Sequence, residues 1–203
     1  MGYTRTFVGS FQLSRKLTAA QSAYLQAFAD TRRMKRDPAL LEIVPDPLRE
    51  AVGLPLGPEG GFFIGDGELR SEDHLTVVDG DEPPQGQPGL WCRWAPSAGG
   101  TAIQWSGFEK FYHHVEWLEY LCEHFLEPWG YTLEGQVDWI GQDGEQQGDE
   151  QHRICAARIL MTYPGPHGRL AAAILRKALK DRSPKVRVAA MEGLESYPEE
   201  YQV

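Results

Sequence analysis

The chain has 203 residues, 41% of them apolar and 11% aromatic, which is enough to bury a core and fold unaided. No apolar run approaches the 18 residues of a membrane span, and the first residues already alternate like a strand, so we expect a cytoplasmic protein without a membrane contact. Residues 1–36 carry 7 basic and 1 acidic side chains, 37–150 carry 4 and 23, and 151–203 carry 9 and 5, giving +6, −19 and +4. The acidic centre argues against a nucleic-acid contact there and favours a basic partner or the chain's own basic ends.

Residues 4–13 alternate between apolar and polar side chains and predict a half-buried strand. Thr18 and Gln21 then form a capping box that opens a helix to about Arg33, with Ala20, Tyr24, Ala27 and Phe28 on its core side. The basic run 32–36 would lie at the negative end of the helix dipole, or form a basic docking patch.

Residues 37–89 hold 8 prolines and 9 glycines and read as an insertion into the main fold. Residues 46–53 have the cap, first-turn proline and terminal glycine of a short helix, and residues 62–64 and 75–78 are expected to pair as a hairpin. The acidic side chains between them lack the ordered spacing of a calcium loop, which favours a solvated loop; they are Asp66, Glu68, Glu72 and Asp73.

Two aromatic runs, 90–94 and 101–105, predict a second hairpin. Its three tryptophans, Trp91, Trp94 and Trp105, read as core residues, with a stacking platform for bases or sugars as the alternative.

The stretch 106–129 predicts the central helix, opened by a Ser106–Glu109 capping box and ended by Pro128 and Gly130. An apolar stripe at helical spacing would face the core; its members are Phe108, Phe111, Tyr112, Val115, Leu118, Cys122 and Phe125. The opposite side carries rings among glutamates, which we call the docking face: His113, Glu116, Trp117, Tyr120 and His124. Because like charges surround its rings, they need cover from the insertion, from the C-terminal tail or from a partner.

Residues 131–139 alternate again, so the predicted order is β, α, β, β, α, β. This order is typical of an α+β, ferredoxin-like fold, an antiparallel sheet with both helices on one face, over residues 1–145. The polar stretch 141–151 predicts a linker.

Residues 152–203 predict a helical tail. Residues 153–160 and 187–194 superpose at an offset of 34 and, with the turn at 181–184, resemble a HEAT-type repeat. This tail could present Arg176, Lys180, Lys185 and Arg187 to a phosphate backbone.

The run GLWCRW followed by FEKFYHHVEWLEYLCEHFLEPWGYTLEGQVDWIGQD resembles a family of small uncharacterised proteins of bacteria and their phages. The resemblance covers residues 1–143. It implies a domain boundary near residue 145 and no particular chemistry.

Catalytic signals are weak. His113 and Glu116 could share one ion on helix 107–127, but no HExxH motif or matching second helix accompanies them. Cys92, Cys122 and Cys155 are odd in number and far apart, which argues against a disulfide framework or a metal site. We therefore expect no cofactor and no metal.

The sequence favours a non-catalytic protein-binding module that meets a basic partner through the docking face, as an immunity protein, an antitoxin or a factor in phage–host conflict would. Nucleic-acid binding by the basic tail is the main alternative. An enzyme or metal site on helix 107–127 is the second.

Overall fold

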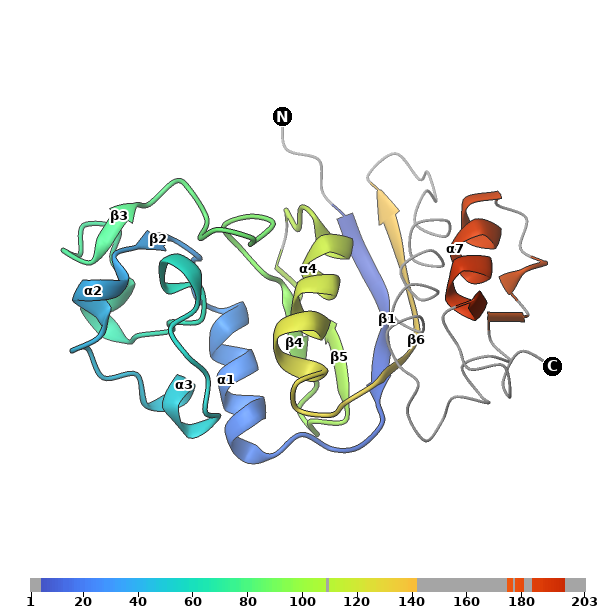
Figure 1. Cartoon of the computed structure of the whole chain (residues 1–203), viewed down its shortest axis with the longest axis horizontal. Helices are drawn as coiled ribbons and strands as arrows, with labels where there is room; N and C mark the ends of the chain where they lie inside the picture. The colour runs from blue at the N-terminus through green and yellow to red at the C-terminus, as the bar shows by residue number, and fades with distance from the viewer. Residues whose placement is uncertain (1–4, 109, 142–174, 177, 181–183, 196–203) are drawn as a thin grey trace. The chain divides into compact units, whose positions relative to one another are not determined.

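The computed structural model describes residues 5–108, 110–141, 175–176, 178–180 and 184–195 (Figure 1). The chain divides into two compact units: residues 1–14 with 121–203 form the first, and residues 15–120 form the second. Every described strand pair is antiparallel, and helices occur in both units, so the fold is of mixed α+β class. In the part of the chain that is described, no helix has the length and apolar character to cross a membrane.

In the first unit, β1 (Arg5–Leu13) pairs with β6 (Leu133–Gly141), from Arg5 opposite Gly141 to Leu13 opposite Leu133. The predicted alternation is confirmed on β1, where Phe7 and Phe11 are buried. Both strands expected at 4–13 and 131–139 are therefore present.

The first unit also contains η3 (Cys122–Leu126), a π-helical turn that continues α4 (His114–Leu121). Its apolar side chains, Cys122, Phe125 and Leu126, are buried. Gly130 then takes a positive φ of 75°, and the amide of Tyr131 donates to the Leu126 carbonyl oxygen at 2.8 Å. The helix thus ends where Pro128 and Gly130 predicted.

In the tail, α7 (Pro184–Glu195) is the helix expected to follow the turn at 181–184. Val186, Ala189 and Ala190 on α7 are buried in a cluster with Leu175. The predicted repeat partner at 153–160 and the linker lie outside the described residues, as does the boundary near residue 145.

In the second unit, α1 (Ala19–Ala29) begins with the predicted capping box, in which Thr18 Oγ1 accepts from the Gln21 amide and the Gln21 side chain accepts from the Thr18 amide. Tyr24, Leu25 and Phe28 are its large buried side chains. The helix ends at Ala29, before the basic run 32–36. The prediction that this run lies at the end of the helix is therefore wrong.

The insertion forms four short helices: α2 (Pro38–Leu41), α3 (Pro47–Ala51), η1 (Pro58–Gly60) and η2 (Gly67–Arg70). It also contains β3 (Val77–Asp79), which pairs with β2 (Lys35–Arg36) just before the insertion. The short helix predicted at 46–53 is α3, and Asp46 caps it. The hairpin predicted between 62–64 and 75–78 is wrong, because β3 pairs with β2. The Arg36 guanidinium, which donates to Thr76 Oγ1 at 2.7 Å, reinforces this pairing from the interior.

The second predicted hairpin is present as β4 (Trp94–Pro96) with β5 (Ala102–Trp105), but β4 shares only Trp94 with the predicted run 90–94. Only Trp94 of the three tryptophans is a core residue, at 1% exposure, whereas Trp91 is 37% exposed. Trp105 is intermediate.

The predicted start of the central helix is wrong, because α4 begins at His114 and not after Ser106. Residues 106–108 and 110–113 are irregular, and Lys110 and His113 take φ values of 60° and 54°, outside the right-handed helical region. The other five residues of the predicted stripe are buried, but Phe108 and Tyr112 are more than half exposed. The buried members are Phe111, Val115, Leu118, Cys122 and Phe125.

Candidate functional site

Trp117 and Tyr120, two rings of the predicted docking face, lie in the interior of the second unit. Trp117 is fully buried and Tyr120 is 6% exposed. Both rings contact Phe28 of α1, at centroid distances of 6.1 and 6.3 Å, and Gln87 of the insertion donates to the Tyr120 hydroxyl at 3.0 Å. Residues of α1 and the insertion thus cover these rings, and they are not presented to a partner.

The rest of the docking face does not converge on a catalytic or metal site. His113 and Glu116 are exposed and lie 3.9 Å apart, from Nδ1 to Oε1, while His124 is partly buried. Among the described residues, no three His, Cys, Asp or Glu side chains gather to hold a metal ion. Burial raises the pKa of Cys92 to about 12, so that this thiol stays neutral and is a poor nucleophile at ordinary pH.

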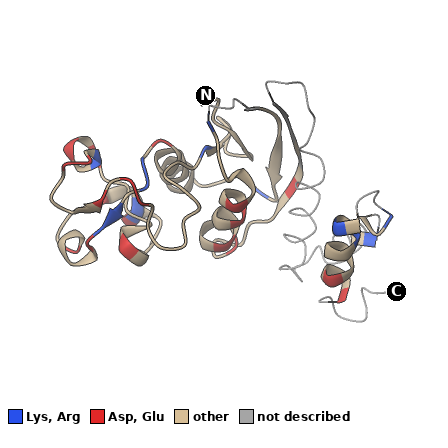
Figure 2. Cartoon of the chain, turned by 90° about the horizontal axis from the view of Figure 1, so that it is seen from above, with Lys and Arg blue, Asp and Glu red and all other residues tan. Residues whose placement is uncertain are grey.

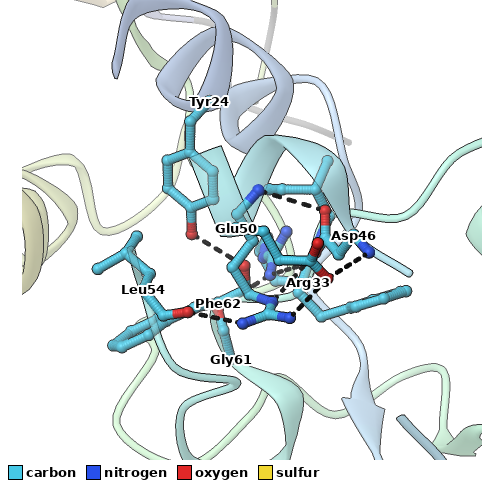
Figure 3. A network of polar contacts seen from close by, with 10 residues as sticks. Tyr24, Arg33, Asp46, Glu50, Leu54, Gly61 and Phe62 are labelled. Carbon is cyan, nitrogen blue, oxygen red and sulfur yellow. Dashed lines mark hydrogen bonds and ion pairs between the residues drawn. The ribbon is translucent and has the colours of Figure 1, made fainter. Parts of the chain in front are cut away.

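Arg33 also lies in the interior of the second unit, with 2% of its surface exposed. Figure 3 shows it near Tyr24, Gly61 and Phe62. Its Nη2 donates to the carbonyl oxygens of Gly61 at 2.9 Å and Phe63 at 2.7 Å, and its guanidinium carbon lies 4.2 Å from the centre of the Phe28 ring. A basic docking patch, the alternative considered for the run 32–36, cannot include Arg33 or Arg36, because both are buried and Arg36 is only 4% exposed.

Burial dominates the electrostatics around Arg33. It lowers the pKa of the Arg33 guanidinium, and nearby Tyr24 and Tyr120 act in the opposite direction. Burial also raises the pKa of Tyr24 well above 10.0, and its hydroxyl donates to the Phe62 carbonyl oxygen at 2.9 Å. The guanidinium still carries its charge at neutral pH, because an arginine is not deprotonated in proteins. Carbonyl dipoles and a ring face compensate that charge, so Arg33 acts as an internal clamp on residues 61–63.

A second clamp, at Asp46, holds the next residue of this segment, Ile64. Asp46 is 2% exposed, and its carboxylate accepts from the backbone amide of Ile64 at 2.8 Å while it caps α3 (Figure 3). The amide of Arg33 donates to the carbonyl oxygen of Leu90 at 2.8 Å, which fixes the chain where it enters the aromatic run 90–94. The buried network therefore positions Leu90, the first residue of that run.

Leu90 lines a cleft of about 420 Å³ within the second unit, which we call the cleft. Its lining comes from two segments: Pro88, Gly89, Leu90, Trp91 and Arg93 from one, and Lys110, Tyr112, His113 and Trp117 from the other. None of these described lining residues is acidic. Trp91 and Tyr112 expose 37% and 54% of their surfaces, so the cleft combines accessible rings with two permanent cations and a histidine.

Arg93 lies between two aromatic rings. Its guanidinium carbon is 4.3 Å from the centre of the Trp91 ring and 4.8 Å from that of Phe108. This stack explains why Phe108, predicted as a core residue of the helix, is instead 55% exposed. Burial lowers the pKa of Arg93, and the charge of Asp30 opposes that shift.

The segment opposite carries local backbone strain. Lys110 and His113 both have positive φ, which costs a residue other than glycine about 1–2 kcal/mol. One local and one tertiary hydrogen bond hold this conformation: the Trp105 indole donates to the Phe108 carbonyl oxygen at 3.0 Å, and the Trp94 indole donates to the His114 carbonyl oxygen at 2.6 Å. Both strained residues, Lys110 and His113, line the cleft.

A wider groove of about 750 Å³ lies elsewhere in the second unit, between the start of α1 and the β4–β5 turn. Small and neutral side chains dominate its lining, such as Ser22, Ala23 and Ser97, and Lys16 is its one charged residue among those described. It offers less chemistry than the cleft.

The four basic residues predicted to bind nucleic acid from the tail differ in their exposure to solvent. Lys180 and Lys185 are exposed, whereas Arg176 and Arg187 are partly buried. Lys185 and Arg187 lie in the first turn of α7, and Glu192 and Glu195 near its end (Figure 2). Positive charge at a helix N-terminus opposes the helix dipole, so these two cations do not stabilise α7 through it.

The sequence analysis missed most of the cleft: among the lining residues it singled out His113 and Trp117 for the docking face and Trp91 for the alternative stacking platform. One signal was present: Trp91 and Arg93 are two apart in an extended run, the spacing that places side chains on the same side of the chain. Tyr112 and Lys110 could not be found, because the sequence placed them on a helix that begins later. Searches against protein-family models, curated protein sequences and solved structures gave no match to this chain.

Proposed function

We propose that this chain is a non-catalytic binding protein whose cleft receives an acidic segment of a partner protein. The observation that carries the proposal is the composition of the cleft: two accessible rings, Trp91 and Tyr112, beside Arg93 and Lys110, with no acidic residue among its described lining. Binding energy at protein interfaces concentrates in such aromatic and arginine side chains.

The charge of the cleft decides the kind of partner. A basic partner was expected because glutamates surround the docking face, but the rings that would anchor it, Trp117 and Tyr120, are buried. The accessible rings lie beside cations, which attract carboxylates and repel a basic surface. A partner with an acidic segment therefore fits better. By analogy alone, an immunity or antitoxin role in the cytoplasm of a bacterium agrees with a small binding protein of this kind.

Two finer features of the fold belong to the same proposal. A ferredoxin-like core is supported by the element order and by antiparallel pairing in both described ladders of the main fold. A HEAT-like tail is supported by α7 and by its buried cluster with Leu175. Amide–amide contacts between β1 and β5 in nuclear magnetic resonance spectra would establish the first, and their absence would reject it.

The experiment uses the tagged full chain, co-purified from its native host and analysed by mass spectrometry. Candidate partners are then titrated against Tyr112→Ala and Lys110→Glu. We expect each substitution to weaken binding about 30-fold, the effect of losing about 2 kcal/mol at a hot spot, with little change in melting temperature.

The matched controls lie outside the cleft. Ile43→Ala removes an apolar side chain that is 87% exposed, and Lys180→Glu reverses an exposed charge in the tail. Equal binding by wild type and the cleft variants would overturn the proposal. Loss of binding in Lys180→Glu, with displacement of the partner by excess duplex DNA, would instead support nucleic-acid binding by the tail.

A further inference from the structure

We propose that Arg93 anchors a single carboxylate of the ligand through two parallel N–H···O hydrogen bonds at the edge of its guanidinium. The inference rests on the proposed function and specifies the chemical group that the cleft recognises. It also assigns Phe108, which does not line the cleft, as the residue that positions this anchor.

The stack of rings restricts how Arg93 can be approached. The guanidinium carbon of Arg93 lies 4.3 Å from the centre of the Trp91 ring and 4.8 Å from that of Phe108. These two ring contacts limit the rotation of the guanidinium. The N–H groups lie in the guanidinium plane and point outward from its edge, in the fork geometry that matches a carboxylate. A ligand therefore meets a donor pair that is already oriented.

The donors of Arg93 are also unused. Within the described chain, the Arg93 side chain forms no hydrogen bond and no ion pair, and its Nε is buried without an acceptor. Arg93 is partly buried, whereas Arg33 and Arg36 are buried arginines of this unit and each donate to two oxygen atoms. Arg93 is thus held in place by stacking while its hydrogen-bonding capacity stays available to a ligand, and an unpaired buried donor gains most from an acceptor.

Two considerations favour a carboxylate over a phosphate. A monoanion loses less hydration on entering a partly closed site than a phosphate dianion, and one guanidinium neutralises it fully. In addition, carboxylates are the anions of unmodified protein segments. Lys110 is exposed and acts as a second positive charge that attracts the same segment without fixing its geometry.

The test follows the Arg93 Nε–H resonance and the Trp91 indole resonance in nuclear magnetic resonance spectra of the full chain. The probes are N-acetyl-glutamate N-methylamide, which carries a side-chain carboxylate, N-acetylglycine, which carries a terminal one, inorganic phosphate, and the neutral N-acetyl-glutamine N-methylamide. We expect both carboxylate probes to shift the Arg93 resonance saturably, and the neutral amide to leave it unchanged. The two carboxylate arms then show whether a side chain or a chain terminus binds more tightly.

Three variants separate charge from geometry. Arg93→Lys keeps the charge but loses the fork and the stack, and we expect it to weaken carboxylate binding about tenfold or more. Phe108→Ala removes one stacking ring without touching the cleft and should weaken binding several-fold, whereas Phe108→Tyr should restore it. Arg70→Lys, at an exposed arginine outside the cleft, is the matched control and should bind like wild type.

The outcomes distinguish this inference from the proposed function. If probes shift the Trp91 and Lys110 resonances but not that of Arg93, or if Arg93→Lys binds as wild type, the cleft is a binding site and the anchor is wrong. A stronger response to phosphate than to either carboxylate also overturns the carboxylate assignment. If a purified acidic partner binds elsewhere and no cleft resonance moves, the proposed function fails as well.

Discussion

Arg32 and Arg33 show how far neighbouring, chemically identical side chains diverge in a folded chain. Arg32 is partly exposed and pairs with Glu72 and Asp81 at the surface, whereas Arg33 is buried and donates to backbone carbonyls. Water screens an exposed ion pair, so its loss costs little. A buried donor or acceptor that loses its hydrogen-bond partner keeps its full desolvation cost.

We predict that Arg33→Ala lowers the free energy of unfolding by about 3 kcal/mol or more, because it opens a cavity and removes the Arg33 donor from the buried Phe63 carbonyl oxygen, while the Gly61 oxygen still accepts from Gln87. Arg32→Ala should cost less than about 1 kcal/mol. Urea unfolding followed by circular dichroism measures both, and Arg33→Met separates packing from hydrogen bonding. Similar losses for Arg32→Ala and Arg33→Ala would contradict the clamp.

At the scale of elements, two capping boxes with the same spacing have different outcomes. Thr18 and Gln21 cap α1, and the box predicted from Ser106 does not open α4, which begins at His114. A cap contributes about 1 kcal/mol, which cannot outweigh the several tertiary interactions of the irregular segment. Those interactions include the Arg93 stack and the two indole hydrogen bonds at Phe108 and His114.

The β1–β6 ladder depends on a glycine. Gly135 has φ of 137°, and a Cβ atom built there would lie 2.6 Å from the Ser10 carbonyl oxygen. We predict that Gly135→Ala destabilises the first unit by about 3 kcal/mol, through backbone strain and a clash with a partner strand that cannot move aside.

The matched control for this prediction is Gly53→Ala. Gly53 also has positive φ, at 69°, but an added Cβ would meet nothing within 4 Å, so only the conformational cost of about 1 kcal/mol remains. Thermal unfolding of the two variants checks the difference. Equal losses would mean that the close approach of β1 at Gly135 is not limiting.

At the scale of the whole molecule, the described strands and helices from β1 to β6 all lie before residue 145. The β1–β6 ladder closes by Gly141, and the buried cluster of α7 consists of tail residues such as Leu175 and Val186. We predict that a chain truncated after residue 145 unfolds in a cooperative transition, because no described core residue of 5–141 is removed. A truncated protein without such a transition in calorimetry would show that residues beyond 145 are part of that core.

Local patterns in the sequence determined the α1 cap, the α3 cap at Asp46, the β4–β5 hairpin and the alternating strands β1 and β6, because each depends on residues close together in the chain. Tertiary structure alone decided which rings are accessible. Phe28 and Gln87, distant in sequence, cover the rings predicted to dock, while stacking on Arg93 draws Phe108 out of the predicted helix. The two segments that line the cleft are 17 or more residues apart, so no local pattern in the sequence shows that they lie together.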